Sequence, residues 1–121
     1  HTGEAVPRIY EKMPMKNAIL EITSKRLGVT AILNERDELE GIITDGDLRR
    51  AIEKFDNILN KSVIDVMTHN PKTIQKDALA TFALRKMEEF SITSLFVMEN
   101  EGETRPVGII HIHDLLKAKI V

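Results

Sequence analysis

The residues best suited to chemistry lie in the stretch GIITDGDLRR, between Gly41 and Arg50, where a hydroxyl and two carboxylates surround a glycine. An apolar strand would run here into a helix, which places free backbone N–H groups and the positive end of the helix dipole beside Thr44 and Asp47. Asp47 could accept hydrogen bonds from the hydroxyls of a ribose, while Thr44 could face a phosphate. Gly46 would let a ligand approach the backbone closely. The stretch therefore suits a nucleotide or a phosphosugar.

The same residues also have a simpler interpretation as a helix cap. Thr44 or Asp45 can serve as the N-cap residue and Asp47 as an acid of the first turn, without any ligand. Because such caps begin most helices, the spacing alone favours a cap over a ligand site.

A second constellation, His111, His113 and Asp114, stands in the stretch HIHD. Alternate residues of a strand point to the same side, so the two imidazoles could share one pocket with Asp114. They could bind a carboxylate, a phosphate or a metal ion. Two histidines and one acid are too few for a zinc site, so we predict contact with an anion or a sugar and no metal. In the structural alternative, His111 ends a strand and His113 caps a helix.

The two constellations belong to two copies of one unit. Gly41 matches Gly108 at a sequence offset of 67 (108 − 41), and the stretch that follows each glycine matches as well. The dipeptide Val-Thr at 29–30 matches Ile-Thr at 92–93 at an offset of 63 (92 − 29). We therefore expect four extra residues in the second hairpin, within 98–106, where a surface loop tolerates insertion.

Each copy is predicted to run helix, strand, strand, helix after an extended lead-in that contains proline. Asp77 is placed as an acid near the start of a helix. A sheet this small cannot bury its face alone, so we expect an α/β fold of two packed units. The predicted helices are 18–22, 47–55, 79–90 and 113–120, and the predicted strands are 29–33, 39–44, 92–98 and 106–112.

Composition narrows the function classes. The chain of 121 residues is 42% hydrophobic, which is enough for a core, and it has no cysteine for a disulfide or a thiolate metal site. Acids and bases are interleaved around a net charge of −2, so nucleic acid is not an expected partner. There is no apolar run of a membrane span's ~20 residues and no hydrophobic signal region, so we expect a cytoplasmic module. No catalytic constellation stands out.

Three motifs carry a family resemblance: Val66-Met67-Thr68 at the boundary between the copies, the G-h-h-T-x-x-D strand end, and the lead-in NPKTI. Over nearly its whole length the chain resembles a tandem CBS-domain pair. The resemblance implies two repeats, 13–61 and 62–121, each with a small, mainly antiparallel sheet and two helices, packed as a pseudo-two-fold pair after a linker at 1–12. It also implies a regulatory module that binds adenosyl or other nucleotide ligands, contacting phosphate and ribose through Thr44 and Asp47, and that forms a homodimer.

The stretches HTGEAVP, TDGDLRR and HIHDLLKAKIV are similar to the C-terminal half of bacterial D-arabinose 5-phosphate isomerases, which join a sugar isomerase (SIS) domain to a CBS pair. This implies that the catalytic domain, which interconverts ribulose 5-phosphate and arabinose 5-phosphate on the route to the Kdo sugar of lipopolysaccharide, is an N-terminal partner absent from this chain. His1 looks like a junction histidine implicated in that active site, and it could equally be an inert linker residue here.

A generic CBS repeat has Thr or Ser where His111 stands, which implies a specialised second site. Our hypothesis is that the effector is CMP-Kdo, with an adenine nucleotide as the alternative. Asp47 or Asp114 would take the ribose, the histidines would take phosphate or the sugar carboxylate, and the backbone of NPKT or AVPR would read the base. A ligand-free oligomerisation element stays open, and an enzyme in its own right is disfavoured. The predicted ligand-binding residues are Thr30, Thr44, Gly46, Asp47, Thr73, Thr93, His111, His113 and Asp114.

Overall fold

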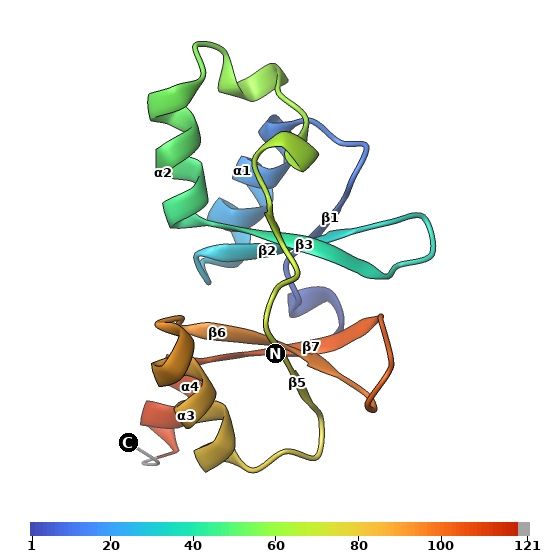
Figure 1. The fold of residues 1–121 in the computed structure, drawn as a ribbon, viewed down its shortest axis with the longest axis vertical. Coiled ribbons are helices and arrows are strands. Elements are labelled where there is room, and N and C mark those ends of the chain that lie inside the picture. Colours follow the sequence, from blue (N-terminus) through green and yellow to red (C-terminus); the bar gives the residue numbers. More distant parts are fainter. Residues whose placement is uncertain (119–121) are drawn as a thin grey trace. The chain divides into compact units, whose positions relative to one another are not determined.

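The structure is a computed structural model that describes residues 1–118, and it divides into two compact units (Figure 1). The first unit comprises Glu4–Pro71. The second begins at Lys72 and also includes His1–Gly3, so the start of the chain belongs with its later half. The last two positions of the helix predicted at 113–120 lie outside the described residues.

The first unit is a four-stranded sheet with its two α-helices on one side (Figure 1). The strand order is β1-β2-β3-β4, with β1 parallel to β2 and the other two pairs antiparallel. The elements are η1 (Gly3–Ala5, which begins in the second unit), β1 (Arg8–Tyr10), α1 (Met15–Lys25), β2 (Val29–Leu33), β3 (Leu39–Thr44), α2 (Asp45–Lys54), η2 (Ile58–Asn60), η3 (Val63–Asp65) and β4 (Thr68–His69).

The core of the first unit forms where α1 covers the sheet. Met15, Ala18 and Ile22 recur at helical spacing and bury one face of α1 against Ile32 and Ile43. The helix ends where Arg26 adopts the left-handed conformation, with φ 61°, and its N–H returns to the carbonyl of Ile22. This ending turns the chain directly into β2.

The second unit repeats this plan with a sheet of order β5-β6-β7, in which β5 is parallel to β6 and β7 is antiparallel to it. Both helices again lie on one side (Figure 1). A core cluster of Ile74, Ala83, Met87, Leu95 and Leu115 fills the space between sheet and helices. The elements are β5 (Thr73–Gln75), α3 (Ala80–Phe90), β6 (Ser94–Met98), β7 (Pro106–His111) and α4 (Ile112–Lys117).

The predicted α/β fold of two small sheets and four helices is confirmed. Strands β2 and β3 have the predicted bounds, and β6 and β7 form the predicted hairpin. The expectation for Asp77 is wrong: α3 begins at Ala80 after the N-cap Leu79 and has no acid in its first turn. The chain is still turning at Asp77, because the Ala78 N–H bonds back to the carbonyl of Gln75.

The predicted four-residue insertion is also wrong. Val29 pairs with Thr44, and Ser94 pairs with His111, so the offset between β2 and β6 is 65 (94 − 29), whereas that between β3 and β7 is 67 (106 − 39). The second hairpin is therefore longer by two residues. The similar dipeptides at 29–30 and 92–93 are not equivalent positions, because strand register, rather than residue similarity, fixes the match.

The compact units divide at Pro71, whereas the predicted repeats divide at residue 61. The segment from η3 to β4 packs with the first unit, because β4 pairs with β3. Likewise β1 lies inside the stretch predicted as a linker, 1–12, and pairs with β2. A sequence repeat and a compact unit are different divisions of the chain, so the repeat boundaries stay a prediction.

Candidate functional site

The helix start of the first unit is a closed capping box. Thr44 is the N-cap of α2, and its Oγ1 accepts a hydrogen bond from the backbone N–H of Asp47 at 3.1 Å. In return, Oδ2 of Asp47 accepts from the N–H of Thr44 at 3.0 Å. The interpretation as a cap is therefore confirmed, with Thr44 rather than Asp45 as the cap residue.

Asp47 has further partners that the sequence analysis missed. Its Oδ1 accepts a hydrogen bond from Nη2 of Arg50 at 2.8 Å, and both its oxygens lie 3.0 Å from Oγ1 of Thr68. Only 8% of Asp47 is exposed. The i, i+3 spacing of Asp47 and Arg50 is a signal that could have found the first of these contacts. A ribose would have to displace Arg50 or Thr68 to reach this carboxylate.

Two other predicted residues of this unit lie differently from Asp47. Gly46 is in the first turn of α2, and a Cβ there would be 3.3 Å from Nη1 of Arg50, so the guanidinium already occupies part of the space beside it. Thr30 pairs with Ile43, whose side chain is in the core cluster, and Thr30 is fully buried. Thr30 therefore faces the opposite side of the sheet from Thr44.

In the second unit an imidazole takes the place of the hydroxyl. His111 ends β7 and is the N-cap of α4, and its Nδ1 accepts a hydrogen bond from the N–H of His113 at 3.1 Å. Oδ2 of Asp114 accepts from the N–H of His111 at 2.8 Å. His113 is thus not the cap, contrary to the structural alternative. It lies on the helix, with its ring centroid 4.5 Å from that of His111.

The structure brings His111, His113 and Asp114 together. It does not do so in the predicted way, as alternate residues of a single strand. The strand ends at His111, and the turn into α4 folds His113 back against it. We call these three residues the HHD cluster. Burial lowers the pKa of His111 below its usual value of 6.5, repulsion from His113 lowers it further, and Asp114 opposes the shift. A neutral ring with Nδ1 as acceptor carries its proton on Nε2, which is then free to donate.

The remaining predicted residues have backbone roles. The carbonyl of Thr93 accepts the N–H of Ile112 at 2.8 Å at the start of α4, and the Thr93 side chain is exposed. Thr73 lies on the edge strand β5, where its carbonyl accepts from Nζ of Lys86 at 2.5 Å. Thr93 therefore lies beside the HHD cluster, whereas Thr73 is separated from β7 by β6.

His1 lies beside the HHD cluster, which the sequence analysis did not foresee. Its Nε2 is 3.6 Å from Oδ1 of Asp114. Its α-amino group donates to the carbonyl of Ile109 at 3.2 Å, and its carbonyl accepts from the N–H of Ile109 at 3.0 Å. The start of the chain is thus an additional strand segment against β7.

Within residues 1–118, no group of three or more His, Cys, Asp or Glu side chains is arranged to hold a metal ion. In the same range, no helix is long and apolar enough to cross a membrane.

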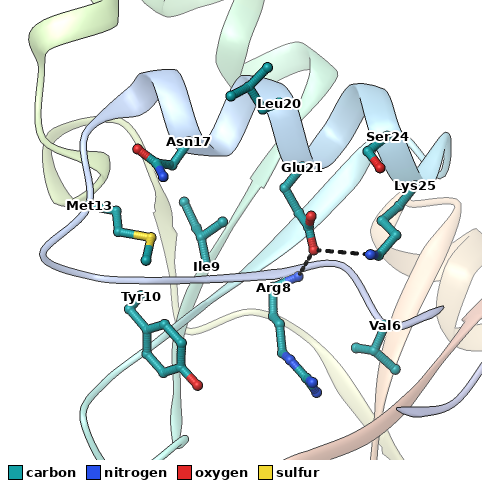
Figure 2. A pocket seen from close by; sticks show the side chains of 10 residues that line it. All are labelled: Val6, Arg8, Ile9, Tyr10, Met13, Asn17, Leu20, Glu21, Ser24 and Lys25. Carbon is teal, nitrogen blue, oxygen red and sulfur yellow. Dashed lines mark hydrogen bonds and ion pairs between the residues drawn. The ribbon is translucent and has the colours of Figure 1, made fainter. Parts of the chain in front are cut away.

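A hollow of about 580 Å³ lies in the first unit between β1 and α1 (Figure 2). Figure 2 shows Glu21 reaching from α1, accepting the N–H of Arg8 at 2.9 Å and lying 3.8 Å from Nζ of Lys25. The carboxylate of Glu21 is therefore already engaged within the protein. Two residues of the stretch AVPR, which is predicted to read a base, line the hollow, whereas none of the nine predicted ligand-binding residues does. The lining consists of Val6, Arg8, Ile9, Tyr10, Met13, Asn17, Leu20, Glu21, Ser24 and Lys25.

Comparison with known proteins finds curated relatives along the whole chain. The chain is 39% identical over 121 residues to arabinose 5-phosphate isomerase KdsD of Pseudomonas aeruginosa, and 37% identical to that of Escherichia coli K12. In both cases all of this chain is covered, and it spans 36% of the length of the relative.

Solved structures share the fold. The CBS domain pair of protein MJ0100, solved in complex with 5′-methylthioadenosine and S-adenosyl-L-methionine, superposes with a TM-score of 0.83 at 22% identity, covering 98% of this chain and 90% of that one. The CBS-domain protein ATU1752 of Agrobacterium tumefaciens gives a TM-score of 0.82 at 23% identity, covering 94% of this chain and 89% of that one.

The family model for the CBS domain matches residues 4–54 and again 63–120. These two matches cover most of the chain and correspond to the two helix-strand-strand-helix copies described above. The chain therefore belongs to the CBS domain family, as a tandem pair.

Proposed function

We propose that this chain is the regulatory, ligand-sensing part of a bacterial arabinose 5-phosphate isomerase, and that its effector binds at the HHD cluster. The observation that carries the proposal is the contrast between the two capping boxes. Asp47 is closed off by Arg50 and Thr68, whereas the side chain of Asp114 is 34% exposed and has two imidazoles beside it. The second helix start thus offers donors and an acceptor to a ligand.

The proposed effector is a nucleotide-type metabolite, with CMP-Kdo as the specific candidate. Asp114 would accept the hydroxyls of a ribose, and Nε2 of His111 would donate to a phosphate or a sugar carboxylate. His113 is exposed and could donate to the same anion. Support for a nucleotide-like ligand also comes from the MJ0100 pair, which holds two adenosyl compounds on the same fold.

The rest of the proposal concerns the longer protein. The similarity to isomerases over 36% of their length supports an additional catalytic SIS domain as this chain's partner, in the cytoplasm of a bacterium. Effector binding would bias that domain only if the ligand has different affinities for two states of the whole enzyme. A homodimer of CBS pairs is the proposed assembly.

Isothermal titration of the chain with CMP-Kdo, CMP, AMP and ATP tests the proposal. We expect CMP-Kdo to bind more tightly than the other three, and His113→Ala to weaken that binding at least five-fold. Thr81→Ala, on the exposed surface of α3, is the matched control and should bind as the wild type does. Equal affinity for all four compounds would reject CMP-Kdo as the effector, and no binding at all would reject the sensing role.

A second candidate function is a ligand-free scaffold for oligomerisation. It is favoured by the first capping box, in which Asp47 already accepts from Thr44, Arg50 and Thr68. A scaffold predicts that none of the four compounds gives a binding isotherm, and that sedimentation gives a dimer with and without nucleotides.

A further inference from the structure

In each unit, a short segment that precedes the other repeat in sequence pairs with the last strand of the hairpin. We call these two segments, residues 68–69 and 1–2, the crossing segments. On β3, Gly41 pairs with His69 and Ile42 pairs with Thr68. On β7, Gly108 pairs with Thr2, and Ile109 exchanges two backbone hydrogen bonds with His1. The same sequence offset relates Gly41 to Gly108 and His1 to Thr68, since 108 − 41 equals 68 − 1. His1 and Thr2 therefore occupy on β7 the positions that Thr68 and His69 occupy on β3.

Both strands carry a glycine where the crossing segment passes. A Cβ on Gly41 would lie 2.7 Å from the carbonyl oxygen of Thr68, and a Cβ on Gly108 would lie 2.9 Å from that of His1. Both distances are too short for a side-chain carbon, so only glycine admits the crossing backbone. The edge of β7 is thus shaped to receive residues 1–3, as β3 is shaped to receive β4.

The crossing residue also touches the acid of the capping box in each unit. Oγ1 of Thr68 lies 3.0 Å from the oxygens of Asp47, and Nε2 of His1 lies 3.6 Å from Oδ1 of Asp114. The chemistry of the two contacts differs. Asp47 is buried and also paired with Arg50, whereas the side chain of Asp114 is 34% exposed and lies 3.6 Å from the imidazole of His1.

The position that corresponds to Arg50 by the same offset is occupied by Lys117, an exposed residue. Within the described part of the chain, Lys117 forms no ion pair with Asp114. The imidazole of His1 therefore meets one oxygen of Asp114 from outside the helix, while the N–H of His111 donates to the other oxygen.

We propose that the β7 edge is a docking site for the chain's own residues 1–3, and that Asp114 couples this docking to the HHD cluster. One carboxylate serves both His1 and the capping box of α4. A ligand whose hydroxyls donate hydrogen bonds to Asp114 must compete with His1, and so loosens residues 1–3 from β7. In the opposite direction, seating of residues 1–3 holds Asp114, and with it His111, in the capped arrangement.

The consequence for a preceding catalytic domain rests on the proposed function, because residues 1–3 would be the segment that joins it. The coupling itself is a property of this chain and can be tested without that domain. The backbone N–H of Ile109, which donates to the carbonyl of His1, reports directly on whether the segment is docked.

Amide hydrogen exchange at Ile109 is measured on the chain with an acetylated N-terminus, so that the α-amino group carries no charge. His1→Ala and Asp114→Asn should each lower the protection of this amide about two- to five-fold, as an exposed ion pair would. The double variant should lose no more than either single variant, because both remove the same contact. His1→Gln keeps a donor of similar reach and should restore part of the protection. Thr68→Val, the matched change on β3, should leave Ile109 unaffected.

Coupling requires more than docking. His1→Ala should also shift the amide resonances of His111 and His113, which form the capping box with Asp114. Unchanged resonances there, or additive losses at Ile109, would overturn the coupling. A separate experiment adds saturating CMP to the wild type, which should lower the hydrogen-exchange protection of the Ile109 amide. If no nucleotide binds, the proposed function fails, while the outcome of the variant measurements stands.

Discussion

Oγ1 of Thr68 donates to the carboxylate of Asp47 at 3.0 Å, which ties the segment leaving the first unit to the start of α2. The two residues are separated by 21 positions in sequence, and they meet because β4 pairs with β3. Asp47 therefore stabilises the position of β4 as well as the start of its own helix. This second role explains why a residue suited to a ribose lies almost fully buried.

Thr68→Val tests the energetic weight of this contact. Valine has the shape of threonine without the hydroxyl, so the change removes one hydrogen bond to a buried carboxylate. We expect the free energy of unfolding to fall by about 1 kcal/mol. Urea denaturation followed by circular dichroism measures it. Thr81→Val, on the exposed surface of α3, is the control and should stay within about 0.5 kcal/mol of the wild type.

The capping box itself should show strong coupling between its two members. Thr44→Ala should cost about 1 kcal/mol of unfolding free energy. Asp47→Ala should cost about 2–3 kcal/mol, because the N–H of Thr44 and the hydroxyl of Thr68 both lose their acceptor. The double variant should cost less than the sum. If the losses of the two single variants in urea denaturation simply add up in the double variant, the two reciprocal hydrogen bonds are not coupled. Asp56→Ala, at an exposed position, is the control for removing a carboxylate.

The local structure was largely predictable from the sequence. The bounds of β2 and β3 follow from short apolar runs with a polar turn between them, and the cap at Thr44 follows from a hydroxyl placed three residues before an acid. Both signals act over a few residues. The repeat was visible as well, because the strand-to-helix segments at Gly41 and Gly108 are separated by one constant offset.

The contacts that close the two helix starts were not predictable in the same way. Thr68 reaches Asp47, and His1 lies beside Asp114, through crossing segments that have no periodic pattern. Matching by residue similarity also treated Thr93 as the equivalent of Thr30 in the second repeat. The equivalence is wrong, because register is set by cross-strand pairing. Gly41 and Gly108 each mark a place where another backbone comes close, but a glycine does not tell which segment of the chain makes the approach.

Replacing Gly41 and Gly46 by alanine distinguishes two effects on stability: a steric clash with a neighbouring backbone and a gain in helix propensity. Gly41→Ala would place a carbon 2.7 Å from both the Met67 sulfur and the carbonyl oxygen of Thr68, so β4 must move. We expect a loss of about 1–3 kcal/mol in unfolding free energy. Gly46→Ala lies in α2, where the nearest atom, on Arg50, belongs to a flexible side chain at 3.3 Å. That variant should be neutral or up to about 1 kcal/mol more stable. Thermal and urea denaturation of both variants check the contrast, and equal losses would contradict it.

The capping histidine should make the second unit acid-sensitive. Burial and the neighbouring His113 lower the pKa of His111 below its usual 6.5. The unfolded chain therefore takes up a proton at His111 at a higher pH than the folded chain does, so the contribution of this group to stability is complete above about pH 6.5 and is lost as the pH falls below it. Protonation at Nδ1 would also remove the acceptor for the N–H of His113.

The variant His111→Thr isolates this effect, because threonine caps the equivalent helix of the first unit in the same way through Thr44. We expect His111→Thr to keep the cap and to lose less stability than the wild type between pH 8 and pH 5. His1, His69 and His113 are present in both proteins, so the two differ only at position 111. Urea unfolding at a series of pH values gives the two curves. If the curves run parallel through this range, the neutral state of the half-buried His111 contributes nothing to acid sensitivity. If the wild-type curve falls more steeply, the cap is a proton-sensitive element of the second repeat.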